Sequence, residues 1–66
     1  MIRKYKIWIE FKNTDGTLAI TDVIDHHITM GYLDVFTENG KEVIDYHVDM
    51  SDIKYWSVYR KIKEVL

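Results

Sequence analysis

Apolar and polar side chains alternate strictly along the first segment of the chain. The apolar positions are Tyr5, Ile7, Ile9 and Phe11. Mostly charged residues stand between them, and such a period of two is typical of a half-buried β-strand. The turn sequence of residues 13–16 follows and ends in a glycine, which adopts positive φ at little cost. A second strand is therefore predicted from about Thr17 to Asp25.

The register of this first hairpin has two solutions. With Asp15-Gly16 as a two-residue turn, Phe11 lies opposite Ile20 on the inner face. Ile7 then lies opposite Ile24. A type I turn with a glycine bulge instead shifts the pairing by one residue and turns three other side chains inward: Ala19, Thr21 and Val23. The first register buries more apolar surface and is preferred.

The segment from about Ile28 to Met50 is predicted to form a second hairpin, after a chain reversal at His26-His27. Asn39-Gly40 favours a two-residue type I′ turn, which places Asp34 directly opposite Asp45. One face of the hairpin then carries a core set: Leu33, Val35, Ile44, Tyr46 and Val48. The other face carries Tyr32, Asp34, Phe36, Val43, Asp45 and His47.

The C-terminal segment from Ser51 to Leu66 is predicted to be a helix. Apolar side chains recur there at helical spacing: Tyr55, Tyr59, Ile62 and Leu66. Ser51 is a suitable N-cap, and the last turns are basic, which the helix dipole favours. The run from Ile53 to Tyr59 is also rich in aromatic and β-branched residues, so a fifth strand is the alternative.

These elements predict one domain, residues 1–66, of the α+β class. The expected fold is a four-stranded antiparallel sheet, made of two hairpins in series, with the C-terminal helix packed across one face. The alternative is a five-stranded SH3-like small β-barrel. Because the four-stranded sheet leaves two open edges and a partly exposed face, we also expect the protein to form a homodimer.

The composition narrows the cellular setting. The 66 residues include no cysteine, which excludes disulfides and thiolate zinc sites. The N-terminus alternates instead of forming an apolar run, so no signal peptide is expected. No segment approaches the roughly 20 apolar residues that span a bilayer. A soluble cytoplasmic protein is the resulting expectation.

Charge is distributed very unevenly along the chain. The net charge is only −2, yet nine of the 11 acidic residues lie in residues 13–53, where Lys41 is the single basic residue. The remaining eight lysines and arginines lie at the two ends, in residues 1–12 and 54–66. The middle of the chain is therefore strongly acidic and both ends are basic.

The predicted pair of Asp34 and Asp45 is the most distinctive candidate site. Two like charges directly opposed on a sheet are destabilising, so a partner's lysine or arginine would relieve the repulsion. Paired carboxylates catalyse acid–base reactions only inside a pocket that shifts their pKa values. A sheet of this size has no evident way to build such a pocket, and we expect no enzymatic activity.

The adjacent residues His26 and His27 suggest a metal site, with Asp25 and His47 as further ligands. Adjacent residues of a strand point to opposite faces, so the two histidines would share an ion only within a turn. The ligand spacing of tetrahedral zinc sites is also missing. We expect no metal and no cofactor.

The acidic middle predicts a small binding module, an inhibitor or adaptor that docks on a basic, nucleic-acid-binding site of a larger protein such as a nuclease. The expected partner-binding residues are Asp34, Asp45, Asp22, Asp25, Tyr32, Phe36, His47 and Trp8. Small, acidic, cysteine-free chains rich in strands resemble phage-encoded counter-defence and host-takeover proteins, such as anti-CRISPR proteins and uracil-DNA glycosylase inhibitors. The resemblance lies in size, charge and strand content, and it implies no role for any single residue.

Two other functions remain open. The basic ends, Arg3-Lys4-Lys6 and Arg60-Lys61-Lys63, would let an oligomer bind nucleic acid or nucleotides. Four aromatic residues near them would stack on bases: Trp8, Tyr55, Trp56 and Tyr59. The acidic middle repels a phosphate backbone, so direct nucleic-acid binding is the alternative and not the main expectation. The second alternative is a structural subunit of an assembly.

Overall fold

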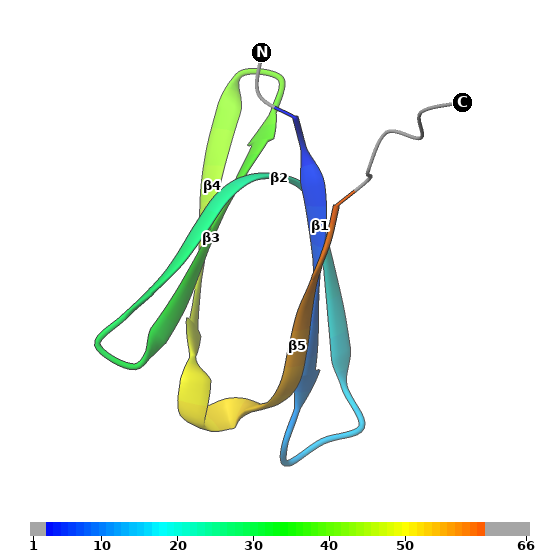
Figure 1. The fold of residues 1–66 in the computed structure, drawn as a ribbon, viewed down its shortest axis with the longest axis vertical. Helices are drawn as coiled ribbons and strands as arrows, with labels where there is room; N and C mark the ends of the chain where they lie inside the picture. Colours follow the sequence, from blue (N-terminus) through cyan, green and yellow to red (C-terminus); the bar gives the residue numbers. More distant parts are fainter. Residues whose placement is uncertain (1–2, 61–66) are drawn as a thin grey trace.

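The computed structural model describes residues 3–60, which form one antiparallel sheet of five strands (Figure 1). The strands are β1 (Tyr5–Phe11), β2 (Thr17–Thr29), β3 (Tyr32–Asn39), β4 (Glu42–Asp49) and β5 (Ile53–Tyr59). A single 3₁₀ turn, η1 (Met50–Asp52), connects β4 to β5. Across the sheet the order is β4-β3-β2-β1-β5, so the last strand returns to lie beside the first.

The prediction of a C-terminal helix and an α+β fold is wrong. Residues 53–59 form β5, which pairs antiparallel with β1 from Lys6↔Tyr59 to Phe11↔Ile53. The fifth strand considered as the alternative is therefore present. The rest of the predicted helix, with Ile62 and Leu66, lies outside the described residues.

Packing explains why the strand prevails over the helical spacing. Trp56 and Val58 alternate toward the core, where they contact the inner side chains of β1. Tyr55 and Tyr59, half of the predicted helical stripe, point outward and are about half exposed. Aromatic and β-branched residues favour such a pleated, half-buried surface. Ser51 is not an N-cap; Asp49 caps η1 instead, by accepting a hydrogen bond from the Ser51 N–H.

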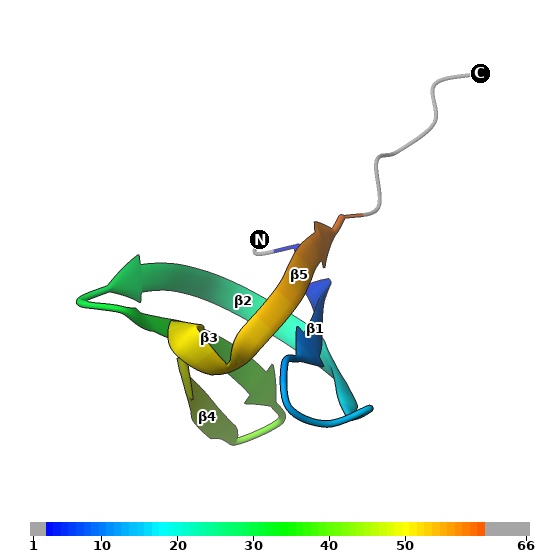
Figure 2. The ribbon, with the colours of Figure 1, turned by 90° about the horizontal axis from the view of Figure 1, so that it is seen from below.

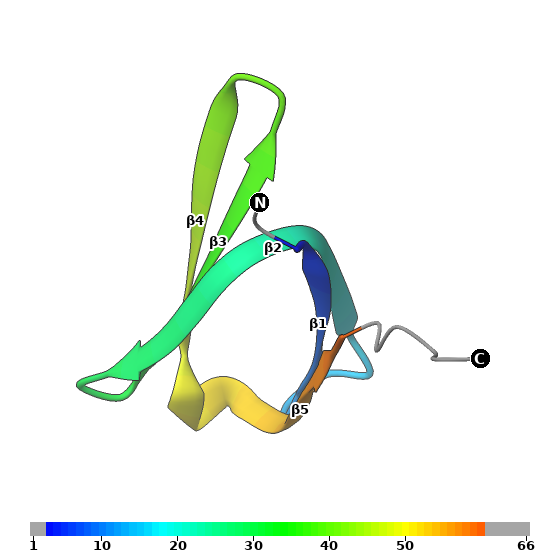
Figure 3. The same ribbon diagram turned by 45° about the horizontal axis from the view of Figure 1, so that its top comes forward.

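β2 is a long strand that bends across the middle of the sheet (Figure 3). Its first half pairs with β1 and its second half pairs with β3. The register of β2 shifts twice, once against β1 near Asp22 and once against β3 near Ile24. Asp22 adopts the left-handed conformation, with φ of 59°. Extra residues of this kind bend a strand and increase its twist, which lets one sheet fold back over its own inner face.

The core lies inside this folded sheet (Figure 2). On one side of it are β5, β1 and the first half of β2, and on the other are the second half of β2, β3 and β4. Its buried members are Ile7, Ile9, Ile20, Val23, Leu33, Val35 and Ile53. Tyr46 and Val48 pack against them from β4, as predicted. Ile44 was expected in the core but is 41% exposed, because it lies toward the far end of the edge strand β4.

The predicted register of the first hairpin is wrong. Ile7 pairs with Ile20, and the N–H of Phe11 donates to the carbonyl of Gly16, so residues 12–15 form a wider loop. The Gly16 N–H donates to the Thr14 hydroxyl at 2.8 Å, a local bond that favours this loop over a two-residue turn.

Because of the bulge in β2, the inward-facing residues of this strand include one from each of the two predicted registers. Ile20 points inward, as in the preferred register, and Val23 is also buried, as in the alternative. Strict alternation forbids residues three apart from sharing a face. The extra residue near Asp22 removes that conflict.

The second hairpin is also displaced, by two residues, from its predicted register. Asn39 pairs with Glu42, so the turn is Gly40-Lys41, and Gly40 has a φ of 66°. A glycine at the first central position is the requirement of a type II′ turn, which competes with the predicted type I′ turn. A shift of two residues keeps every side chain on its predicted face but changes its partner across the strands.

The chain reverses at Met30-Gly31 and not at His26-His27, which lie within β2. Met30 and Gly31 both have positive φ, 52° and 82°, as in a type I′ turn. Met30 is 92% exposed, so its side chain gains little from packing that would offset the strained backbone.

Replacing Met30 by asparagine should therefore stabilise the protein. Asparagine tolerates the left-handed region, and Asn-Gly is the preferred type I′ sequence, so the free energy of unfolding should rise by about 0.5–1 kcal/mol. Urea unfolding followed by circular dichroism measures the change. Met30→Ala, which keeps the strained conformation, is the matched control and should leave stability nearly unchanged. Equal stability of all three proteins would show that the turn stores no strain.

Among the residues that the structure describes, no helix is long and apolar enough to cross a membrane.

Candidate functional site

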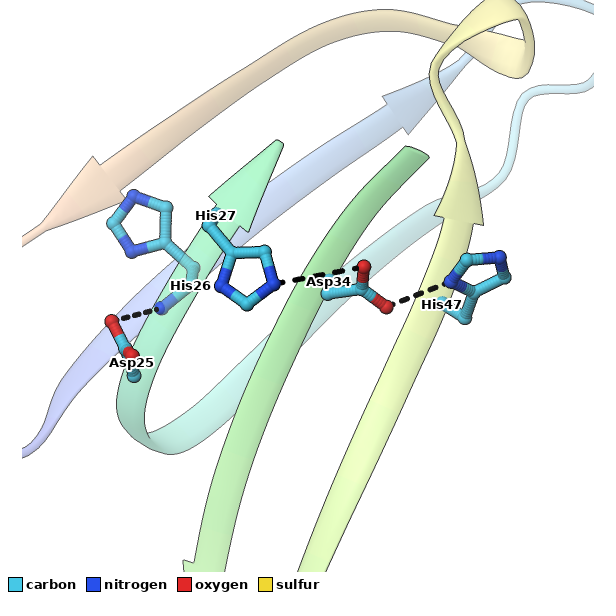
Figure 4. Close-up of polar contacts among 5 residues, drawn as sticks. All are labelled: Asp25, His26, His27, Asp34 and His47. Atoms are coloured by element: carbon cyan, nitrogen blue, oxygen red, sulfur yellow. Dashed lines mark hydrogen bonds and ion pairs between the residues drawn. The ribbon is translucent and has the colours of Figure 1, made fainter. Parts of the chain in front are cut away.

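A row of three polar side chains crosses the outer face of β2, β3 and β4 (Figure 4). Asp34 of β3 lies opposite His27 on β2 and opposite His47 on β4. The Nδ1 atom of His47 is 2.7 Å from Asp34 Oδ1, a hydrogen bond in which the imidazole N–H donates. The Nε2 atom of His27 is 4.0 Å from Asp34 Oδ2. The carboxylate is therefore held between two imidazoles.

The prediction that Asp34 directly faces Asp45 is wrong, because the register displacement puts His47 in that place. Asp45 instead pairs with Phe36, diagonally next to Asp34 on the same face. The observed register replaces a repulsive like-charge pair with a hydrogen bond. The two carboxylates nevertheless remain neighbours whose ionisation is linked.

The ionisation of the two aspartates differs for physical reasons. The hydrogen bond from His47 is the main cause that holds the pKa of Asp34 below its ordinary value. The pKa of Asp45 is raised, mainly by partial desolvation and secondly by the negative charge of Asp34. A like charge nearby always favours the protonated form of a carboxyl group. A cation from a partner would counteract this repulsion.

Aromatic rings enclose the row from both sides. Tyr32 stacks on His47 with ring centroids 4.2 Å apart, and Phe36 lies against His27 at 5.4 Å. These contacts leave the Asp34 side chain only 13% exposed, whereas both imidazoles stay more than half exposed. The rings thus fix a partly covered carboxylate in the centre of an outward surface.

We call this surface the acidic face. Five carboxylates point outward from the three strands on this face: Asp25, Asp34, Glu38, Asp45 and Asp49. The salt bridges formed by residues 3–60 involve only His27 and His47 with Asp34. Within this part of the chain, no lysine or arginine therefore forms a salt bridge with a carboxylate of the acidic face.

Six of the eight predicted partner-binding residues gather on this face: Asp25, Tyr32, Asp34, Phe36, Asp45 and His47. Asp22 and Trp8 do not. Asp22 sits in the bulge of β2, beside the ends of β1 and β5. Trp8 lies on β1, where its indole N–H donates to Glu10 at 2.9 Å. His27 belongs to the row and was missed, because the sequence does not reveal that it lies opposite Asp34.

The two adjacent histidines occupy different environments, as strand geometry requires. His26 points inward, where its Nδ1 accepts a hydrogen bond from the Tyr5 hydroxyl at 2.6 Å and its ring meets Trp56 edge-on. The pKa of His26 is lowered, mainly by desolvation and secondly by the nearby positive charge of Arg60. Burial raises the pKa of Tyr5, which keeps its hydroxyl proton available to His26. His26 is therefore a neutral structural side chain.

Stability should fall as the pH drops below about 6.5, in part because of His26. The unfolded chain binds the proton with the ordinary pKa of 6.5, and the folded chain binds it less tightly. Protonation therefore favours unfolding. The loss of stability begins near the pKa of His26 in the unfolded chain and is complete below its pKa in the folded chain. His26→Asn keeps an acceptor for Tyr5 but does not titrate, so its unfolding free energy should decline less between pH 7.5 and pH 5. Parallel declines in urea unfolding would contradict this role.

Among the described residues, no group of three or more histidine, cysteine or acidic side chains is arranged to hold a metal ion. In the histidine row, the two ring nitrogens approach opposite oxygens of Asp34 instead of converging on one point (Figure 4).

A second cluster lies at the ends of β1 and β5. Lys4, Lys6 and Arg60 line an open groove together with Tyr5 and Tyr59. Both basic ends are evident in the sequence, but only the pairing of β5 with β1 brings them together. Trp56, which was expected to stack on bases, faces the core instead.

No family model, no curated protein and no solved structure matches the chain.

Proposed function

We propose that this protein is a small acidic binding module that docks on a basic, nucleic-acid-binding surface of a larger protein, as an inhibitor or an adaptor. The observation that supports the proposal is the acidic face, whose carboxylates have no lysine or arginine partner within residues 3–60. Carboxylates spaced along neighbouring strands would take the place of nucleic-acid phosphates. Charges of this kind steer the encounter of two proteins and fix its register.

The apolar and aromatic side chains of the face would supply contact area. Tyr32 is 38% exposed and Val43 is 60% exposed, next to the carboxylates. Interfaces of soluble complexes combine such residues with a polar rim, and tyrosine is a frequent anchor. Asp34, partly covered and central, is the carboxylate whose removal should weaken docking most, because desolvated charges interact more strongly than fully hydrated ones.

The test compares two double variants that remove the same charge. Asp34→Asn/Asp45→Asn neutralises the centre of the face while it keeps side-chain shape. Asp15→Asn/Asp52→Asn is the control, since both residues are exposed and lie outside the face. Each immobilised protein is incubated with nuclease-treated lysate of the source organism, and the retained proteins are identified and purified. Affinity for the purified partner is then measured at low and high salt.

We expect the wild type and the control to retain one nucleic-acid-binding protein that the face variant loses, with at least about a tenfold rise in Kd, or about 1.4 kcal/mol. Duplex DNA should compete with the wild type for the partner, and high salt should weaken the complex. Equal binding by both variants, or binding that DNA leaves unchanged, would contradict the proposal.

A further inference from the structure

The groove at the ends of β1 and β5 is a second charged surface, which borders the acidic face where Lys4 donates to the backbone carbonyl of Glu38. It has a volume of about 580 Å³ and opens to solvent. Its lining comes from the start of β1, the bulge of β2 and the end of β5, namely Lys4, Tyr5, Lys6, Thr21, Asp22, Tyr59 and Arg60. In the strand order of the sheet, β1 and β5 lie on the other side of β2 from β3 and β4, which carry most of the acidic face.

The groove combines three cations with two phenol rings. Arg60 places its guanidinium 4.6 Å from the centre of the Tyr5 ring, a cation–π contact that orients the charge. Lys4 donates from Nζ to the backbone carbonyl of Glu38 at 3.1 Å, which uses only one of its three donors. Asp22 is the single acidic residue of the lining. The groove is therefore positive in sum.

Tyr59 supplies a ring that faces solvent. It lies opposite Lys6 on the outer side of the β1–β5 pair and is 52% exposed. Tyr55 lies further along the same face of β5 and is 51% exposed. Between them, on the neighbouring strand, Trp8 pairs with the small residue Ser57. Successive outward positions on a strand are about 7 Å apart, a spacing that allows neighbouring bases to stack on different rings.

We propose that this groove binds single-stranded nucleic acid, with Lys4, Lys6 and Arg60 on the phosphates and Tyr59 stacked on a base. Positive charge that follows a backbone, beside exposed aromatic rings, is the usual arrangement for strands without base pairing. The rings argue for unpaired bases and against an acidic peptide, which has no planar base to stack. Because the groove and the acidic face are formed by different residues, the protein could hold a strand and a protein partner at once.

The probe is a fluorescently labelled 12-nucleotide oligothymidylate, with oligouridylate and a duplex of equal length in parallel. Anisotropy titrations at several salt concentrations give Kd and its salt dependence. Lys6→Gln removes one groove cation, and Lys12→Gln removes the same charge from an exposed residue outside the lining. Tyr59→Ala removes the exposed ring. Asp22→Asn removes the one acid of the lining, and asparagine tolerates its left-handed backbone.

Lys6→Gln should weaken binding several-fold and reduce the slope of log K against log salt by about 0.7, the value for one lost phosphate contact on a single strand. Lys12→Gln should leave that slope unchanged. Tyr59→Ala should weaken binding about tenfold. Asp22→Asn should tighten binding. The preferred probe should be a single strand, of either sugar, and not the duplex.

Three results would overturn the inference: no saturable binding of either single strand by the wild type at low salt, equal losses for Lys6→Gln and Lys12→Gln, or preference for the duplex. Polyglutamate and unlabelled oligonucleotide are also compared as competitors, at equal concentrations of negative charge. If polyglutamate displaces the labelled strand more effectively, the inference is overturned in favour of an acidic protein ligand. Asp34→Asn/Asp45→Asn should bind the strand at least as well as the wild type, so failure of this site and failure of the acidic face are observed separately.

Discussion

Replacing Leu33 by alanine is expected to lower the free energy of unfolding by about 3 kcal/mol. Leu33 is completely buried near the start of β3, where its side chain belongs to the core inside the folded sheet. Its truncation removes apolar contacts and leaves a cavity that the paired backbone cannot close. Domains of this size are stable by only about 3–10 kcal/mol, so the variant should be close to unfolding at room temperature. Urea unfolding followed by circular dichroism measures the loss.

The matched control for Leu33→Ala is Ile44→Ala. The sequence pattern assigns both residues to the same core face, but Ile44 is 41% exposed on the edge strand β4. Its truncation should cost less than about 1 kcal/mol, since much of the side chain is already in water. If the two variants lose similar free energy of unfolding, Ile44 is more deeply buried than its exposed fraction of 41% indicates.

Asp22→Val is expected to cost about 1–3 kcal/mol, although Asp22 is exposed and contributes no core contact. The reason is the backbone, whose φ of 59° crowds a β-branched side chain against the neighbouring carbonyl group. The same bulge is where β2 starts to bend around the core. The variant should therefore unfold at lower urea concentration and show weaker protection of the β1–β2 amides in hydrogen exchange.

Two controls separate this backbone effect from a loss of charge. Asp22→Asn removes the carboxylate but tolerates the left-handed region, so its stability should match the wild type within about 0.5 kcal/mol. Thr21→Val places the same side chain one residue earlier, at an exposed position with ordinary backbone. If all three variants lose equal stability, the left-handed conformation at Asp22 is not the cause.

The two charged surfaces depend on different ends of the fold. The acidic face needs the register of β2, β3 and β4, while the basic groove needs the pairing of β5 with β1. A change that weakens one surface can therefore leave the other intact. A chain of net charge −2 therefore carries two surfaces of opposite charge.

Part of the candidate site could be predicted from the sequence. The outward set of Tyr32, Asp34, Phe36, Asp45 and His47 follows from alternation alone, because a register shift of two residues preserves the face. The pairing of Asp34 with His47 could not be predicted, since it depends on whether the turn uses Asn39-Gly40 or Gly40-Lys41. That choice is a small difference in turn energy, weighed against packing along the whole hairpin.

For the C-terminal segment, the sequence alone could not decide between a helix and a strand. From Ile53 to Tyr59 the sequence fits a helix by spacing and a strand by residue type, so the local signals disagree. The open edge of β1 decides between them, because it offers backbone hydrogen bonds and an apolar inner face to β5. Such a partner, distant in the chain, has no trace in the local pattern.

By itself, the sequence determined which side chains of β1 and β3 face inward, the acidic middle and the basic ends, because alternation and charge are local properties of the chain. Only the tertiary structure decided the strand pairing of residues 53–59, the two bulges of β2 and the row of His27, Asp34 and His47. These features arise from contacts between distant segments. Backbone hydrogen bonding and core packing then override local preferences that differ by only about 1 kcal/mol.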